Sequence, residues 1–438
     1  MKVLIIGSGG REHCLAWKLA SASNVSKIYA IPGNPGIAKI GQCINIGISG
    51  SDFKSISDFV FEENIDFTIV GPEAPLVDGI VDFFQSKGQK IFGPDKSAAR
   101  LEGSKVFTKE LCVKYGIPTA GSIKFNRNDY SEAVSYIKNL NDGDFPVVIK
   151  VDGLAAGKGV IIPQTKESAL DEITNCFINN TFGSAADSLI IEEFIEGFEV
   201  SLLNLCDGRN IVPMALAQDY KKIFDGDRGK NTGGMGSYSP VPFVDEKLFN
   251  KMLSEIIYPS YEAIIKEGIN YRGVLYGGII VSKGQPYLLE YNCRFGDPET
   301  QAILPNLNSD LLDLMLRCSD GKLGSSKCSW RNTKCVCVVL ASQGYPETSS
   351  KNDLIEGLDC PGDAETEKGG NSAIVFHAGT ISRNSKIYTN GGRVLGVVAS
   401  AESFKQARKV VYEAISNIRF EGMQFRRDIA KRVEEEIS

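Results

Sequence analysis

The sequence predicts an α/β protein with several domains, and three observations lead to this class. At 438 residues the chain is too long for one hydrophobic core. Before about residue 102, short apolar runs end in glycine or proline and alternate with helical stretches, which is typical of a parallel α/β unit. From about residue 326 a new strand-rich pattern begins. We therefore expect domains at residues 1–102, 103–325 and 326–438.

Composition narrows the classes of partner. The net charge is -6, with 42% hydrophobic and 23% charged residues, which gives no support for a nucleic-acid or anionic-membrane partner. No apolar run approaches the roughly 18 residues of a membrane span. The eleven cysteines are scattered without a C-x-x-C pair, so neither a disulfide framework nor a zinc site is indicated. We expect a cytoplasmic protein that binds no nucleic acid and no membrane.

The first strand ends in a glycine-rich turn. The stretch "VLIIGSGGREH" places Gly9 and Gly10 between a strand and a helix, where backbone N-H groups and the helix dipole favour a phosphate. The next strand ends in "IYAIPGNPG" and carries no acid that could hold the ribose of a dinucleotide. A monophosphate therefore fits this turn better than a dinucleotide.

A second glycine-rich segment, "VVIKVDGLAAGKGV", indicates a strand, a loop and a returning strand. It lacks the Walker A spacing, and a lid that closes over a polyphosphate is the better interpretation. Lys105, near a predicted helix start, offers a further cation. The alternative is a plain glycine turn with solvated surface lysines. The groups that would contact phosphate are Lys150, Gly153, Gly157, Lys158 and Gly159.

The strand "SLIIEEFI" carries acids before a short apolar segment. The backbone around Phe194 and Ile195 could bond an adenine edge, and Glu199 beyond the turn could accept from ribose hydroxyls. Acids at a strand edge, here Glu192 and Glu193, are more often solvated than functional, so this signal alone is weak.

The segment "AQDYKKIFDGDRGKNTGGMGSYSP", which contains Asp219, is expected to be a long glycine-rich loop without hydrophobic anchors. Long loops of this kind in compact domains are usually functional or disordered, and we expect a lid or a substrate loop. An amphipathic helix should follow over about residues 244–268. His13 and His377 are expected to be structural, so that positioning and phosphate activation supply the chemistry.

The stretch "LLEYNCRFGDPETQ" concentrates polar groups beside an apolar strand. The strand period of two puts Glu290 and Asn292 on one face, where a carboxylate and an amide oxygen suit a hard cation such as Mg²⁺. Without a cation or donors this pair would be costly in an apolar hairpin. Arg294 follows where it can grip an anionic oxygen, and Asp297 can cap a helix that runs through Ile303.

Together these motifs resemble the phosphoribosylamine-glycine ligase family, or glycinamide ribonucleotide synthetases, of the ATP-grasp superfamily. Matching stretches run in the family's order over residues 5 to about 397 and include "GSGGREH", "GPEAPL", "LEGSKVFTK", "NTGGMGSYSP", "RFGDPETQ" and "GGRVLGV". The resemblance implies a multidomain ATP-grasp fold with an N-terminal Rossmann-like domain, a lid subdomain at about 122–193 and a C-terminal strand-rich domain. It also implies that ATP, glycine and 5-phosphoribosylamine give glycinamide ribonucleotide, ADP and phosphate through a glycyl phosphate.

The resemblance further implies roles for individual residues. ATP would be held by Lys105, Lys150, the loop from Gly153 to Gly159, the segment Glu192 to Ile195, and Glu199. Mg²⁺ or Mn²⁺ would be held by Glu290 and Asn292. The sugar phosphate would meet Gly9, Gly10, Gly33, Asn34, Pro35 and Gly36, and the glycine and amine sites would be lined by Asp219, Arg294 and Asp297. The catalytic residues would be Lys150, Arg294 and Asp297, in a monomer or a weak homodimer.

Two positions depart from the family. Tyr220 stands where relatives often carry His, and Lys230 where they often carry Pro, which leaves the role of position 220 and the stiffness of this loop open. Three other functions would fit parts of the sequence: an ATP-grasp ligase with a different nucleophile, a nucleotide-binding regulatory protein and a hydride-transfer enzyme. The metal and anion cluster disfavours a mere binder, and the missing ribose acid disfavours hydride transfer.

Overall fold

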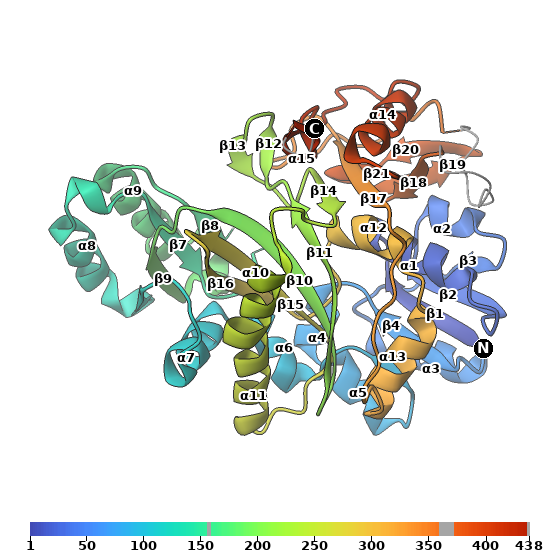
Figure 1. The fold of residues 1–438 in the computed structure, drawn as a ribbon, viewed down its shortest axis with the longest axis horizontal. Helices are drawn as coiled ribbons and strands as arrows, with labels where there is room; N and C mark the ends of the chain where they lie inside the picture. The colour runs from blue at the N-terminus through green and yellow to red at the C-terminus, as the bar shows by residue number, and fades with distance from the viewer. Residues whose placement is uncertain (156–158, 359–371, 436–438) are drawn as a thin grey trace.

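The computed structural model describes residues 1–155, 159–358 and 372–435 (Figure 1). Its N-terminal unit contains a five-stranded parallel sheet in the order β3-β2-β1-β4-β5. Helix α1 packs on one face, while α3 and α5 cover the other. The predicted parallel α/β unit is therefore confirmed. The strands are β1 (Lys2–Gly7), β2 (Lys27–Pro32), β3 (Cys43–Asn45), β4 (Phe67–Val70) and β5 (Ile91–Phe92).

Helices of this unit and of the segment that follows it begin near strand ends or at polar caps. Ser104, for example, accepts a 3.1 Å hydrogen bond from the Phe107 nitrogen and so caps α7. The helices are α1 (Gly10–Ala20), α2 (Pro35–Lys39), α3 (Phe53–Glu62), α4 (Glu73–Asp78), α5 (Ile80–Ser86), α6 (Lys96–Gly103) and α7 (Lys105–Tyr115).

A second sheet, of four antiparallel strands, projects at the left of Figure 1. Phe125, Ile149 and Ile173 belong to a hydrophobic cluster of its own, which joins the sheet to two helices. The loop with Gly153 enters from β7, and Gly157 and Lys158 lie outside the described residues. The elements are β6 (Ser122–Asn126), α8 (Tyr130–Asn139), β7 (Val147–Val151), β8 (Val160–Ile161), α9 (Lys166–Phe177) and β9 (Ser188–Glu193).

The central sheet has eight antiparallel strands in the order β16-β15-β10-β11-β14-β17-β21-β18. It runs without a break across the expected boundary at residue 325, because β14 pairs with β17. The domain boundaries stay predictions. The strands are β10 (Phe198–Asp207), β11 (Ile211–Asp219), β14 (Gly236–Ser239), β15 (Arg272–Ser282), β16 (Gln285–Asn292), β17 (Lys334–Ala341), β18 (Ile374–His377) and β21 (Arg393–Ala401).

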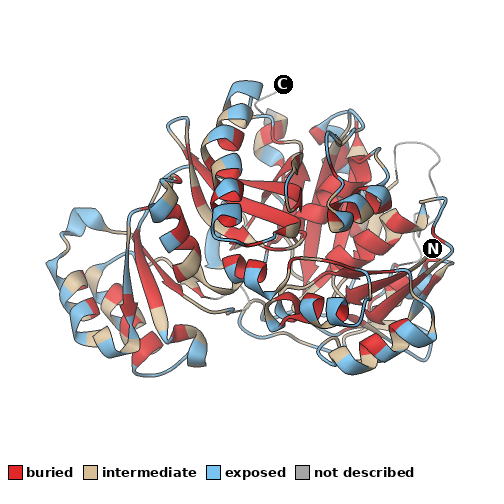
Figure 2. Cartoon of the chain, turned by 90° about the horizontal axis from the view of Figure 1, so that it is seen from below, coloured by how far each residue is buried: buried red, intermediate tan, exposed pale blue. Residues whose placement is uncertain are grey.

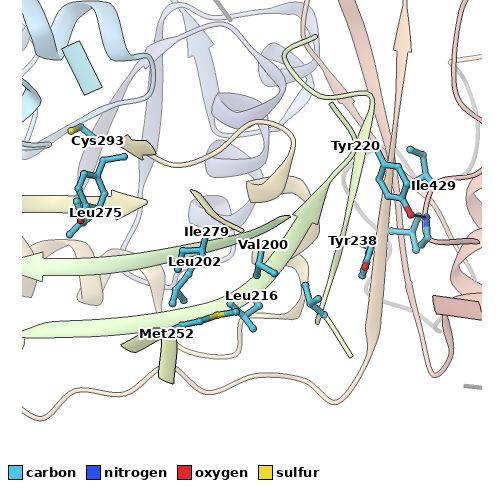
Figure 3. Packing of buried hydrophobic residues seen from close by; sticks show 14 of the residues in the cluster. Val200, Leu202, Leu216, Tyr220, Tyr238, Met252, Leu275, Ile279, Cys293 and Ile429 are labelled. Carbon is cyan, nitrogen blue, oxygen red and sulfur yellow. Dashed lines mark hydrogen bonds between the residues drawn. The ribbon is translucent and has the colours of Figure 1, made fainter. Parts of the chain in front are cut away.

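Apolar side chains cover both faces of the central sheet. Figure 3 shows Val200, Leu202, Leu216, Ile279 and Met252 gathered from β10, β11, β15 and α10. In Figure 2 the strands lie inside, while the outer helix faces are exposed. The covering helices are α10 (Glu246–Met252), a π segment (Leu253–Ile257), α11 (Tyr258–Lys266), α12 (Glu299–Ile303), α13 (Leu311–Asp320), α14 (Phe404–Ile415) and the C-terminal α15 (Lys431–Glu435).

The segment expected to be a long loop instead forms a hairpin of β12 (Lys222–Phe224) and β13 (Arg228–Asn231). The expectation that it lacks hydrophobic anchors is wrong, since Ile223 and Met235 are buried against Ala341. A further hairpin joins β19 (Thr380–Arg383) to β20 (Lys386–Thr389). Among the described residues, no helix has the length and apolar character needed to cross a membrane.

Candidate active site

A cavity of about 540 Å³ is lined by residues of the four-stranded sheet, the central sheet and helices α6 and α7. Most of the residues expected to bind ATP, metal, glycine or amine line it: Lys105, Lys150, Gly159, Glu192, Glu193, Phe194, Ile195, Glu199, Asp219, Glu290, Asn292, Arg294 and Asp297. The N-terminal glycine turns do not line the cavity, but the turn with Gly9 and Gly10 adjoins it, because Asp297 of the cavity wall accepts from the backbone nitrogen of Arg11 at 3.3 Å. The structure thus brings most of the expected residues into one cavity.

Two lysines share one buried carboxylate. Lys150 Nζ lies 2.8 Å from Glu192 Oε2, and Lys109 Nζ lies 2.9 Å from Glu192 Oε1. Lys150 also donates to the Leu289 carbonyl at 2.9 Å. The Glu192 side chain therefore pairs with two cations, and its backbone lies inside β9, between β6 and β7. Lys109 was missed by the sequence analysis, although its spacing of four from Lys105 puts both on one face of α7.

Lys105 and the loop after β7 meet at the cavity wall. Lys105 Nζ lies 3.4 Å from the Gly153 carbonyl. Asp152 ties the same loop to the start of α7, because its Oδ1 accepts from Val106 N at 2.8 Å and from Ser104 Oγ at 2.9 Å. Burial lowers the pKa of Lys105, an effect that Glu290 opposes and Lys150 strengthens. A ligand phosphate would relieve the repulsion between the two ammonium groups.

The expected metal pair lies at the end of β16. A bulge between Leu288 and Glu290 interrupts the alternation along the strand, but Glu290 and Asn292 follow it and stay two residues apart. Burial would raise the pKa of Glu290, yet Lys221, Lys150 and Lys105 hold it below its ordinary value. Among the described residues, no hydrogen bond or ion pair engages this carboxylate. A charged carboxylate beside an amide oxygen fits a hard divalent cation.

Arg294 is held between two acids. Its Nε lies 3.1 Å from Glu73 Oε2, and its Nη2 lies 2.9 Å from Glu102 Oε1. Its Nη2 also donates to Asn292 Oδ1 at 3.2 Å. Burial would lower the pKa of Arg294, but Glu102 and Glu73 raise it. This arginine therefore ties β16 to α4 and α6, and its two partners were missed although both lie in motifs of the resemblance.

Asp297 does not cap helix α12, so that expectation is wrong. Pro298 occupies the cap position. The Asp297 carboxylate instead accepts from Gln301 Nε2 at 2.8 Å and from the backbone nitrogen of Arg11 at 3.3 Å. It also lies 3.5 Å from Arg393 Nη1. Burial would raise the pKa of Asp297, but Arg393 and Arg11 lower it. The carboxylate thus links the first turn of α1 to α12 and β21.

The glycine turns of the N-terminal unit come together. Asn34 donates to the carbonyls of Ser8 and His377, both at 2.9 Å, and its Oδ1 caps α2, which begins at Pro35. Gly36 cannot carry a side chain, because a Cβ there would lie 2.2 Å from a His13 ring carbon. Gly33 has a φ of +70°, which favours glycine.

The backbone donor of Gly9 in this turn is already used. Its nitrogen donates to Glu12 Oε2 at 2.5 Å. A Cβ at Gly10 would lie 2.7 Å from Gln301 Nε2, so the Gly10 backbone packs directly against α12. A phosphate at this turn would therefore meet Gly9 only after displacing Glu12.

Near Asp219, Glu199 and Lys221 form an ion pair. Lys221 Nζ lies 2.7 Å from Glu199 Oε2, the expected ribose acceptor. Burial raises the pKa of Asp219 to about 7, with Lys221 opposing the shift and Glu299 adding to it. A carboxyl group with such a pKa can take up a proton near neutral pH.

Tyr220, the position that departs from the family, has a clear structural role. It is buried, and its OH accepts a 3.0 Å hydrogen bond from the Ala430 nitrogen. Its ring lies 4.7 Å from the Arg426 guanidinium carbon. Arg426 is itself fully buried and paired with Asp227 and Asp428. Tyr220 thus anchors the C-terminal segment to the β12–β13 hairpin.

Comparison with known proteins places this geometry in a family. Models of the phosphoribosylglycinamide synthetase N domain, ATP-grasp (A) domain and C domain match residues 1–102, 103–300 and 335–432. This chain belongs to the phosphoribosylglycinamide synthetase family. The resemblance seen in the motifs and the multidomain ATP-grasp fold that it implied are confirmed.

Relatives of the synthetase family cover almost the whole chain. Proteins named phosphoribosylamine-glycine ligase from Caldanaerobacter subterraneus subsp. tengcongensis and Neisseria meningitidis serogroup B are each 46% identical over 98% of this chain and 99% of their own. A crystal structure of the same-named protein from Thermotoga maritima is 34% identical, with a TM-score of 0.80, over 98% of this chain and all of the other. The biotin carboxylase domain of Hydrogenobacter thermophilus 2-oxoglutarate carboxylase, 17% identical at a TM-score of 0.72 over 97% of this chain and 91% of that one, shares the fold.

Proposed function

We infer that this protein is an ATP-dependent ligase that joins glycine to 5-phosphoribosylamine, forming glycinamide ribonucleotide, ADP and phosphate in purine biosynthesis. Family membership supports the reaction. One structural observation carries it: the cavity gathers Lys105 and Lys150 beside the acid-amide pair Glu290 and Asn292. This set suits a triphosphate held together with a hard cation.

Two bond exchanges account for the products. A carboxylate oxygen of glycine attacks the γ-phosphorus of ATP, the bond from that phosphorus to the bridging oxygen breaks, and ADP leaves. The amine of 5-phosphoribosylamine then attacks the carbonyl carbon of glycyl phosphate. Phosphate departs with the electron pair of the broken C–O bond, and the nitrogen loses a proton. No covalent enzyme intermediate is needed.

The nucleotide would lie between the two sheets. Lys105, Lys150 and the loop from Gly153 to Gly159 contact its phosphates, with Gly157 and Lys158 as further proposed contacts outside the described residues. The segment Glu192 to Ile195 receives adenine, with the backbone of Phe194 and Ile195 at the adenine edge, and Glu199 accepts from ribose. Lys150 acts catalytically, because its charge faces the phosphoryl group in transfer.

Glu290 and Asn292 would hold Mg²⁺ or Mn²⁺. Both ligand atoms are oxygens, a donor set that suits either ion. When bound, the cation neutralises charge on the nucleotide phosphates and polarises the phosphoryl group in transfer.

The remaining substrates would lie beyond the phosphates. Gly9, Gly10 and the turn Gly33-Asn34-Pro35-Gly36 contact the sugar phosphate. Arg294 and Asp297 orient glycine and the amine, and both act catalytically by holding the two reacting groups in line. Asp219, whose pKa is raised to about 7, accepts the proton that the attacking amine loses.

We propose the domains 1–102, 103–325 and 326–438, with a lid subdomain at about 122–193. The separate hydrophobic cluster of the four-stranded sheet supports the lid. A monomer or a weak homodimer is the proposed assembly, and sedimentation at several protein concentrations distinguishes the two.

Release of ADP tests the function. With ATP and Mg²⁺, turnover should require both glycine and 5-phosphoribosylamine. Glu290→Gln should abolish turnover, while Glu262→Gln, on the exposed face of α11 beside Lys266, should not change it. ADP release that ignores the omission of either substrate contradicts the proposed reaction, and an active Glu290→Gln protein contradicts the metal site.

A further inference from the structure

The C-terminal helix α15 contributes a side chain to the cavity. Arg432 lines it together with Gln218 of β11 and Glu199 of β10. Figure 1 shows α15 next to the β12–β13 hairpin. The Arg432 guanidinium donates to Gln218 Oε1, although 214 residues separate the two.

The side-chain amide of Gln218 is held in one orientation by this contact and two others. Its Oε1 accepts hydrogen bonds from Arg432 and from the Tyr238 hydroxyl. Its Nε2 donates to the Glu199 carbonyl at 2.5 Å. Because guanidinium and hydroxyl both donate to the oxygen, the amide can face only one way, with its nitrogen toward Glu199. Arg432 therefore determines which group Gln218 presents to the backbone of the expected ribose acceptor.

The surroundings of Arg432 differ from those of a structural arginine. Arg426 nearby is bound by Asp227 and Asp428. Within the described part of the chain, Arg432 has no carboxylate partner, and its buried Nε has no hydrogen-bond acceptor. Its guanidinium carbon instead lies 5.6 Å from the ring centres of Tyr220 and Phe243, which hold the group in place. Among the residues that the structure describes, this cation donates its hydrogen bond to Gln218.

We propose that Arg432 is a positioning residue for the nucleotide ribose, which acts through Gln218 on Glu199. Glu199 is held at two points: Gln218 binds its carbonyl, and Lys221 binds its carboxylate at 2.7 Å. With both points fixed, the second carboxylate oxygen is oriented toward the cavity and accepts from a ribose hydroxyl. This inference rests on the proposed function, because it takes the cavity as the nucleotide site.

Discrimination between ATP and its 2′-deoxy and 3′-deoxy analogues tests the proposal. Dissociation constants are measured by calorimetry with Mg²⁺ on the full chain, for wild type, Arg432→Met, Arg432→Lys and Arg408→Met. Arg408 is the matched control, because it anchors the same helix through Glu434 at 2.7 Å and does not line the cavity. It reports what loosening of α15 does by itself.

In Arg432→Met, ATP should bind about ten- to 100-fold more weakly, the loss of roughly one hydrogen bond to a charged group. The deoxy analogue that lacks the bound hydroxyl should lose less than about twofold, so the preference for ATP falls. The preference of Arg432→Lys for ATP over the deoxy analogue should lie between those of wild type and Arg432→Met. Arg408→Met should keep the wild-type preference.

An unchanged preference in Arg432→Met overturns the inference while leaving the proposed function intact. If the melting temperature of Arg432→Met is lower than that of Arg408→Met, the preference for ATP over the deoxy analogue is measured in Gln218→Leu. A reduced preference supports the inference, and a wild-type preference overturns it. Wild-type protein that binds neither ATP nor its analogues overturns the proposed function, and the inference with it.

Discussion

His13 Nδ1 accepts a 2.8 Å hydrogen bond from the backbone nitrogen of His377, across a sequence separation of 364 residues. Both rings are buried, with centroids 5.7 Å apart. An imidazole that accepts through Nδ1 must be neutral, so protonation of His13 breaks this link between α1 and β18.

The histidine pair should make stability depend on pH. Burial lowers the pKa of His13 well below its ordinary value and that of His377 to about 3. Between the folded pKa and about 6.5 the unfolded chain binds more protons, so stability is full above pH 6.5 and falls as the solution becomes more acidic. The slope should approach about 1.4 kcal/mol per pH unit for each histidine.

Urea unfolding between pH 7.5 and 5 measures this slope. His377→Gln should reduce the slope by about 1.4 kcal/mol per pH unit, because one of the titrating histidines is removed. Equal unfolding midpoints at both pH values in wild type would contradict the prediction.

Asp219 should set the acid limb of the rate profile. With its pKa raised to about 7, it is ionised and able to accept a proton above that pH, so kcat should fall as pH drops through about 7. Asp219→Asn should lower kcat by about 100-fold or more and remove this limb. Asp58→Asn, in an exposed pair with Lys54, is the control and should match wild type. A limb that persists in Asp219→Asn assigns the titration to another group.

Glu192 should be more important for stability than for contact with adenine. Glu192→Gln leaves Lys109 and Lys150 buried without their shared carboxylate, which should cost about 3 to 5 kcal/mol. ATP supplies negative charge to the same lysines, so it should raise the melting temperature of the variant more than that of wild type. Thermal unfolding with and without ATP measures both effects. An equal rise in melting temperature in the two proteins would show that these lysines do not contact the nucleotide.

Tyr220 should stabilise the chain without taking part in the reaction. Tyr220→Phe removes the hydrogen bond from Ala430 and should lower the free energy of unfolding by about 1 kcal/mol at unchanged kcat. Tyr220→Ala also removes the ring beneath Arg426 and should be clearly less stable. Denaturant midpoints and initial rates provide the comparison, and a large loss of kcat in Tyr220→Phe would place this hydroxyl in the reaction.

Local patterns in the sequence determined the parts of the site that lie close together along the chain. The strand period placed Glu290 and Asn292 side by side, and the glycine turn after the first strand follows from short-range turn chemistry. Such features depend on backbone geometry within a few residues, which one sequence can report.

Only the tertiary structure decided the long-range partners. The pairing of Lys109 with Glu192, of Arg294 with Glu73 and Glu102, and of Arg432 with Gln218 joins segments far apart in the chain. The β12–β13 hairpin was expected to be a loop because Arg426 and Asp428, which hold it, lie about 200 residues away. A buried charge needs a partner, but periodicity does not say which one, since that choice is made when the packed sheets bring distant side chains together.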